Sequence, residues 1–171
     1  GLSAGEVVAV PTPRLHKRSD APQGSLSPLQ PGVVSNATGR LRVDAPAGTF
    51  TAPADAWLAE LDGQTLPALL PRGWSPIAGA WFSFSHPRLG AVQASLELDA
   101  GVAGLGGTVV IFNETSGRYE GLASAIRTGN TLRFPLSANA VVVVVVPDEG
   151  GGLSAPANGP ALAGLSAVDP A

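Results

Sequence analysis

Six consecutive valines, Val141–Val146, constrain this chain more than any other stretch of its sequence. Their β-branched side chains favour strands, and the run is far shorter than the ~20 apolar residues that a membrane-spanning helix needs. An uncharged segment of this kind aggregates when its backbone edge is exposed. We therefore expect either a central strand or an edge strand that another segment completes, ended by the polar and proline residues 147–149.

Other segments show the two-residue alternation of half-buried strands. The alternation is clearest over Val92–Leu98 and recurs over 41–44 and 131–136. Pro135 cannot donate a hydrogen bond to a neighbouring strand, which indicates an edge position or a bulge there. Thr108–Phe112 is nearly continuous in apolar and β-branched residues, so we expect it to be buried on both faces.

Turn-forming residues separate these strands. Asn113–Gly117 and Gly129–Asn130 each predict a hairpin, and Ser137–Asn139 leads into the valines. Asp55–Leu61 can form about two helical turns, but a proline before it and a glycine after it confine the segment. We interpret it as a strand. About eight or nine strands, with a turn every ~8–12 residues, predict an all-β fold, an antiparallel immunoglobulin-like β-sandwich.

Composition divides the chain into three parts. Residues 1–35 contain five prolines and no sustained periodicity, which predicts an extended arm. Residues 149–171 have the Gly/Ala/Pro composition of a tail or linker. Residues 36–148 remain as the β-sandwich domain.

The arm contains two features that favour contact with protein. A valine-rich segment has strand character and can complete a sheet edge of this domain or of a neighbour. Three of the 10 basic residues follow it within five positions. This cluster is compatible with a solvated patch, a docking site on an acidic neighbour or a protease-sensitive dibasic pair. The residues concerned are Val7, Val8, Val10, Arg14, Lys17 and Arg18.

The charge balance excludes one class of partner. With 10 basic and 13 acidic residues and a pI of about 5.2, the chain lacks the basic surface that nucleic acids require. The absence of cysteine excludes disulfides and thiolate metal sites, and the absence of methionine indicates a processed product or a fragment of a longer chain. We expect it outside the cell or at the cell surface, without a membrane span. Asn36 and Asn113 match the glycosylation sequon, a pattern too short to be specific.

Few residues point to catalysis. His16 and His86 are the only histidines, and a zinc site usually needs about two or three imidazoles, so we expect no metal and no cofactor. A hydrolase centred on His86 would need a serine and a carboxylate such as Asp99, but no G-x-S-x-G motif positions them. Residues 104–107 are glycine-rich but precede a strand, whereas a phosphate-binding loop leads into a helix. We therefore expect a chain that is not an enzyme.

Aromatic side chains are the best candidates for a ligand site. Trp57, Trp74 and Trp81 can form a platform on which sugars stack, but a sandwich core also needs large side chains. Phe82 and Phe84 alternate with Trp81, so one of the two sets is expected to face outward.

Several stretches resemble the ZU5-like β-sandwich modules of animal receptors and scaffolds and of bacterial surface proteins. They are similar to that family's opening strand with its P-x-G turn, its middle segment and its late hairpin. The stretches are Gly39–Val43, Ala45–Phe50, Leu69–Ile77, Val110–Asn113 and Gly117–Glu120. Some members self-cleave at a His-Phe-Ser step, but residues 134–138 at that place contain no histidine. Over about residues 39–146, the resemblance implies an interaction or spacer module without catalysis.

These observations predict a non-enzymatic, extracellular structural or adhesive module that belongs to a larger cell-surface assembly. Its expected partners are other protein subunits or neighbouring domains of a longer chain. The alternative is a carbohydrate-binding module whose exposed tryptophans bind glycans.

Overall fold

The computed structural model describes residues 21–103 and 107–148 of the chain, which form eleven strands and one helical turn. Within these residues, no helix has the length and apolar character to cross a membrane. The first sheet contains β1 (Gly24–Leu26), β4 (Ala54–Leu61), β5 (Trp74–Phe84), β7 (Thr108–Asn113), β8 (Arg118–Gly121) and β11 (Ala140–Pro147). The second contains β2 (Gly32–Ser35), β3 (Leu41–Ala45), β6 (Val92–Glu97), β9 (Ile126–Thr128) and β10 (Thr131–Leu136), and the turn is α1 (Ala100–Ala103).

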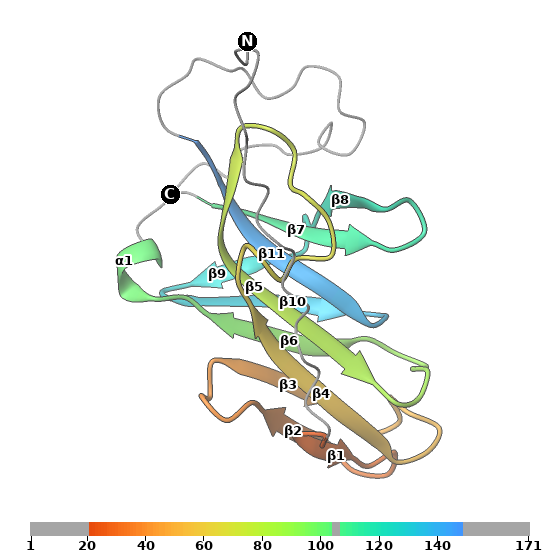
Figure 1. The fold of residues 1–171 in the computed structure, drawn as a ribbon. Helices are drawn as coiled ribbons and strands as arrows, with labels where there is room; N and C mark the ends of the chain where they lie inside the picture. Colours follow the sequence, from red (N-terminus) through yellow and green to blue (C-terminus); the bar gives the residue numbers. More distant parts are fainter. Residues whose placement is uncertain (1–20, 104–106, 149–171) are drawn as a thin grey trace, which may run out of the picture.

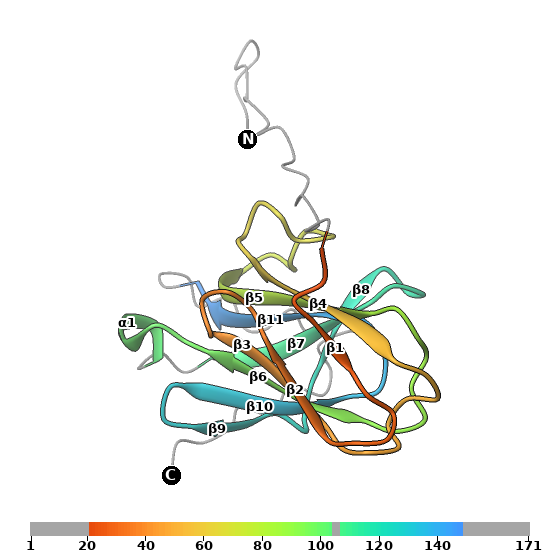
Figure 2. The ribbon, with the colours of Figure 1, turned by 90° about the horizontal axis from the view of Figure 1, so that it is seen from below.

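The two sheets are antiparallel and pack face to face (Figures 1 and 2). The six-stranded sheet has the order β1-β4-β5-β11-β7-β8, and the five-stranded sheet has the order β2-β3-β6-β10-β9. The predicted all-β sandwich is confirmed. The strand number exceeds the predicted eight or nine because β1, β2 and β9 have only three or four residues each.

The valine run forms β11 in the middle of the six-stranded sheet, as predicted. It pairs with β5 on one side and β7 on the other, with a bulge between Val144 and Val145. Beyond its end, the Asp148 backbone N–H donates to the Gly73 carbonyl (2.9 Å). Both edges of the valine strand are therefore paired, which removes the aggregation hazard of its composition.

The main core lies between the sheets. Phe82 of the six-stranded sheet meets Phe134 of the five-stranded sheet edge to face, with ring centroids 5.8 Å apart. Val142 and Val144 point into the same cluster. Edge-to-face aromatic pairs contribute about 0.5–1.5 kcal/mol beyond the burial of their area, so this contact helps to set how the two layers meet.

A second, smaller cluster covers part of the outer face of the six-stranded sheet. Val143 and Val145 contact Tyr119 there, together with Trp74 and apolar residues of the segment 62–73 between β4 and β5. The Tyr119 hydroxyl donates to the Ala68 carbonyl (3.0 Å), and burial raises the pKa of this tyrosine. The valine strand is thus buried on both faces, because this segment folds back over it.

The folded region begins earlier than the predicted boundary at residue 36. β1 pairs with β4 and β2 pairs with β3, so residues 24–35 belong to the sandwich and not to an extended arm. The two strands are too short to show a two-residue alternation and are flanked by proline, so the sequence did not predict them. The remaining parts of the predicted arm and tail, 1–20 and 149–171, lie outside the described residues.

The predicted turns are confirmed. Asn113–Gly117 joins β7 to β8, and Gly129 and Asn130 join β9 to β10. The φ angles of Gly117 (65°) and Gly129 (60°) lie in the left-handed region that favours glycine. Asp55–Leu61 is a strand, and β9 ends opposite Arg133, which leaves Pro135 of β10 at a local edge as expected.

Candidate functional site

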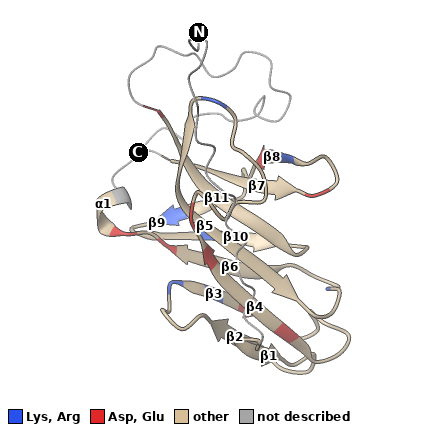
Figure 3. Cartoon of the chain, in the orientation of Figure 1, with Lys and Arg blue, Asp and Glu red and all other residues tan. Residues whose placement is uncertain are grey.

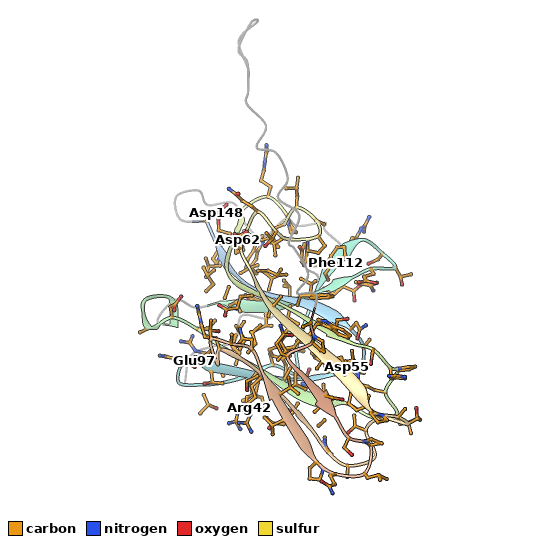
Figure 4. All side chains as sticks on the ribbon, turned by 60° about the horizontal axis from the view of Figure 1, so that its bottom comes forward. Arg42, Asp55, Asp62, Glu97, Phe112 and Asp148 are labelled. Atoms are coloured by element: carbon orange, nitrogen blue, oxygen red, sulfur yellow. The ribbon has the colours of Figure 1, made fainter. Side chains whose placement is uncertain are left out.

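The outer faces of the two sheets differ in character. β5, β7 and β11 in the six-stranded sheet contain no charged residue (Figure 3), and the segment 62–73 covers part of their outer face. The outer face of the five-stranded sheet is polar and open. Arg42 and Glu97 lie on this flank of the molecule, whereas Phe112 and Asp62 lie on the other (Figure 4).

The register of the strands aligns the polar side chains in rows. Arg42 of β3 pairs with Ser95 of β6, and Ser95 pairs with Arg133 of β10. The neighbouring row contains Asp44, Gln93 and Pro135, and on the far side Glu97 pairs with Thr131. Neighbouring strands are about 4.8 Å apart, so the two arginines stand ~10 Å apart at the backbone with a serine between them. Their side chains reach over the same hollow.

That hollow has a volume of about 450 Å³ and is lined by these polar residues. A second hollow of about 690 Å³ lies beside it and shares Asp44 and Gln93. Apolar groups line the second one, among them Val33, Pro46 and Pro135. The face therefore changes from charged at one end to apolar at the other, a mixture that is common in protein interfaces.

Two of the arginines at this site are tied to carboxylates. Arg42 Nε lies 3.1 and 3.0 Å from the two carboxylate oxygens of Asp44, and this hydrogen-bonded pair raises the pKa of Arg42. Arg40 contacts Glu60 (3.2 Å) and Asp99 (3.1 Å) and donates to the Glu97 carbonyl. Because Glu60 belongs to β4, Arg40 joins the two sheets at one end of the sandwich.

Other polar groups of the face have no such partner. Within residues 21–103 and 107–148, the exposed side chains of Arg133, Gln93 and Glu97 make no hydrogen bond or ion pair. A guanidinium, an amide and a carboxylate are thus available to a ligand on one open surface. The alternation of polar and apolar residues in β6 and β10 predicted that these side chains face solvent. It did not show that they lie together on one surface.

The tryptophans divide between two environments. Trp74 belongs to the small cluster under the segment 62–73. Trp57 and Trp81 lie on the outer face of the six-stranded sheet, because Leu58 and Phe82 next to them point into the main core. Ala59 pairs with Trp81, which makes the two tryptophans diagonal neighbours on adjacent strands, and both are half-buried.

The candidate catalytic residues do not come together. Ser85 Oγ lies 2.9 Å from His86 Nδ1, but Asp99 lies beyond the opposite end of β6 and pairs with Arg40. Six residues of strand extend about 20 Å, which separates His86 from Asp99. Nowhere in the described ranges do three or more acidic or histidine side chains converge on a possible metal site.

The structure describes the two sequon asparagines but not the predicted contact residues of the arm. The Asn36 amide donates to Glu60 (2.9 Å) and accepts from the Leu41 N–H (3.0 Å), so it joins strands of both sheets. The side-chain Oδ1 of Asn113 accepts from the backbone N–H groups of Thr115 and Ser116 in its hairpin. The predicted arm contacts fall outside the described residues. They are Val7, Val8, Val10, Arg14, Lys17 and Arg18.

The fold and this face define a class, an antiparallel two-sheet β-sandwich with one partly covered and one open outer face. No protein-family model matches the chain, and no curated protein has a significantly similar sequence. The function must therefore be inferred from the faces themselves.

Proposed function

We propose that the chain is a non-enzymatic structural or adhesive module, located outside the cell as part of a larger surface assembly. In this proposal the open face of the five-stranded sheet contacts its partner, another protein subunit or a neighbouring domain. The ZU5-like resemblance of residues 39–146 is compatible with such a role. No membrane span, metal or cofactor is part of it.

The proposal depends on a difference between the outer faces of the two sheets, one of which the chain itself partly covers. The chain covers part of the apolar face with its own segment 62–73, held by the hydrogen bond from Tyr119 to Ala68. It leaves the polar face open, with Arg133, Gln93 and Glu97 free of internal partners among the described residues. The backbone of a sheet is already ordered before a partner binds. Binding through side chains on a sheet therefore has a smaller entropy cost than binding through a loop, which favours this face as the contact surface.

Loss of the free side chains is expected to abolish binding without loss of stability. The test variant combines Gln93→Ala with Arg133→Ala, and the matched control combines Gln64→Ala with Arg118→Ala. The control removes the same residue types from exposed positions outside the candidate face. Surface extracts and intact cells of the producing organism would be passed over a sensor coated with full-length chain. We expect retention by wild type and control, and at least about a tenfold weaker signal from the test variant.

Two results would contradict the proposal. One is a wild-type surface that retains nothing, and the other is equal retention by the test and control variants. Equal melting temperatures of all three proteins are required before either comparison is made, because an unfolded variant would lose binding for a trivial reason.

The alternative is a carbohydrate-binding module, and the position of Trp57 and Trp81 favours it. These diagonal neighbours on one sheet face have the spacing of about 7–8 Å that lets two rings act together. If they bind sugars, soluble polysaccharides should quench tryptophan fluorescence, and Trp57→Ala should remove the response. A flat response across neutral and acidic polysaccharides would count against this alternative.

A further inference from the structure

Two side chains of opposite charge on the open face of the five-stranded sheet have no partner among the described residues. They are Arg133 of β10 and Glu97 of β6, both exposed. Arg133 pairs with Ser95 and Glu97 pairs with Thr131, and the residues between them point into the main core. The four residues thus form the corners of a rectangle on the outer face. The charged side chains occupy one diagonal, and the two hydroxyl side chains occupy the other.

The charged diagonal is not closed within the chain. Diagonal neighbours on antiparallel strands are about 7–8 Å apart, and in the described ranges neither side chain takes part in an ion pair or hydrogen bond. Exposed ion pairs gain little, because water screens the charges and two long side chains lose freedom when they meet. Arg133 and Glu97 therefore remain available to a molecule that covers the face and excludes water.

A second copy of the chain can satisfy both charges at once. A half-turn about an axis parallel to the face and close to the hydroxyl diagonal exchanges the two charged corners. Arg133 of each copy then faces Glu97 of the other, while Ser95 and Thr131 face their own counterparts. A hydroxyl group both donates and accepts hydrogen bonds, so two identical hydroxyls can pair. Such self-complementarity is what a two-fold interface between identical chains requires.

The other arginines of the face do not oppose this arrangement. Arg42, which lies on the same flank of the molecule as Glu97 (Figure 4), is neutralised by the carboxylate of Asp44. Arg40 is held by Glu60 and Asp99 of its own chain. The charges that a partner must match are therefore the free pair alone.

The signs of this pair select among possible partners. A partner with acidic groups only would attract Arg133 but repel Glu97, and a partner with basic groups only would do the reverse. A second copy offers one charge of each sign at the matching separation, since it carries the same rectangle. Charge complementarity therefore favours the chain itself as the occupant of the face.

The size of the face limits the strength of this contact. Five strands of at most six residues cover roughly 24 by 20 Å. Two copies would then bury on the order of 1,000 Å² in total, at the low end of specific interfaces. We expect a weak dimer in dilute solution. Weak contacts of this kind become well occupied where many copies are attached to one surface, because attachment raises their local concentration.

We propose that the open face of the five-stranded sheet binds a second copy of this chain about a two-fold axis, through reciprocal contacts between Arg133 and Glu97. This inference rests on the adhesive function proposed above and names its partner. The module would connect surfaces or subunits that carry the same chain.

Charge reversal in the full-length chain tests the contact. The variants are Arg133→Glu, Glu97→Arg and the matched control Arg118→Glu, which reverses an exposed arginine on β8 of the other sheet. In sedimentation velocity over a range of concentrations, wild type and control are expected to dimerise, and added salt should weaken the dimer. Each face variant alone should associate at least about tenfold more weakly, because like charges then meet.

A mixture of the two face variants is the sharpest sample. Glutamates at 97 and 133 of one copy then face arginines at both positions of the other, so fluorescently labelled Glu97→Arg should form dimers with Arg133→Glu. The same labelled chain mixed with Arg118→Glu has the same total charge but keeps one pair of facing arginines. It should bind at least about tenfold more weakly, which excludes attraction by net charge alone.

Three results would overturn the inference. They are a wild type that stays monomeric at millimolar concentration, equal dimerisation of the face variants and the control, and a mixture that does not recover. If surface material is nevertheless retained by the sensor described above, the proposed function stands with a different partner, such as an acidic protein or a glycan. Melting temperatures are compared first. If a reversed variant melts below the wild type, Arg133→Gln and Glu97→Gln replace the pair, and each must weaken the dimer.

Discussion

Replacement of Val143 by aspartate is expected to abolish cooperative folding. Val143 is 0% exposed and lies in the middle of β11, between Gly79 of β5 and Val110 of β7. A carboxylate there would have no partner in the small apolar cluster, and such burials cost more than about 4 kcal/mol. This is comparable with the total stability of about 5–15 kcal/mol of a typical domain. Far-UV circular dichroism during heating should show no transition.

Val146→Asp is the control for this experiment. Val146 is half-buried at the end of the same strand, where it pairs with Ser75, so a carboxylate there can remain hydrated. We expect it to lower stability by about 1 kcal/mol and to retain a cooperative transition. If the two variants had equal stability, the segment 62–73 would not seal the outer face over Val143.

Arg88→Met is expected to stabilise the protein by about 1–3 kcal/mol. Both terminal nitrogens of Arg88 are buried, and no hydrogen-bond partner for them is present in the described part of the chain. The guanidinium carbon lies 4.4 Å from the centre of the Phe84 ring, a contact that only partly offsets the loss of hydration. Methionine removes the charge, and its flexible apolar side chain can pack against the Phe84 ring in place of the guanidinium. Urea unfolding of both proteins at neutral pH would measure the difference.

The pH dependence identifies the charge as the cause. Burial lowers the pKa of Arg88 to about 10, below its usual value, so the folded state penalises the charged form at all lower pH values. Above about pH 10 the unfolded chain binds more protons at this position than the folded chain, and the stability of the wild type rises relative to the variant. The advantage of Arg88→Met should therefore be constant near neutral pH and shrink above about pH 10. Tyr119 also titrates there but is present in both proteins, so its effect cancels.

Arg88→Ala separates charge from packing, because it removes the charge together with the apolar part of the side chain. We expect it to be less stable than Arg88→Met. A wild type more stable than Arg88→Met at neutral pH would show that the guanidinium has a partner and would refute the prediction.

The regular strands and hairpins of this fold could be predicted from the sequence. The alternation over Val92–Leu98 and the six valines are local patterns, and so are the turn glycines at 117 and 129. Each depends on side-chain periodicity or on a single backbone conformation, which neighbouring residues determine. β1 and β2 could not be found in this way, since three or four residues become strands only when β4 and β3 pair with them.

For the candidate face, too, the sequence predicted part of the arrangement and strand pairing decided the rest. The sequence predicted that Gln93, Glu97 and Arg133 would lie on the polar sides of their strands. Only the register of β3, β6 and β10 places them in adjoining rows on one open surface. The separation of His86 from Asp99 likewise depends on which end of β6 each one follows.

The sequence by itself determined which segments are strands, where they turn and that the valine run must be covered, because these properties follow from local periodicity and hydrophobicity. Tertiary structure alone decided what covers it. The segment 62–73 has no strand periodicity, and its burial over Val143 and Val145 depends on contact with Tyr119, which lies about fifty residues further along the chain. The free energy of such contacts arises only when distant parts of the chain meet, so one sheet face became a second core and the other remained open.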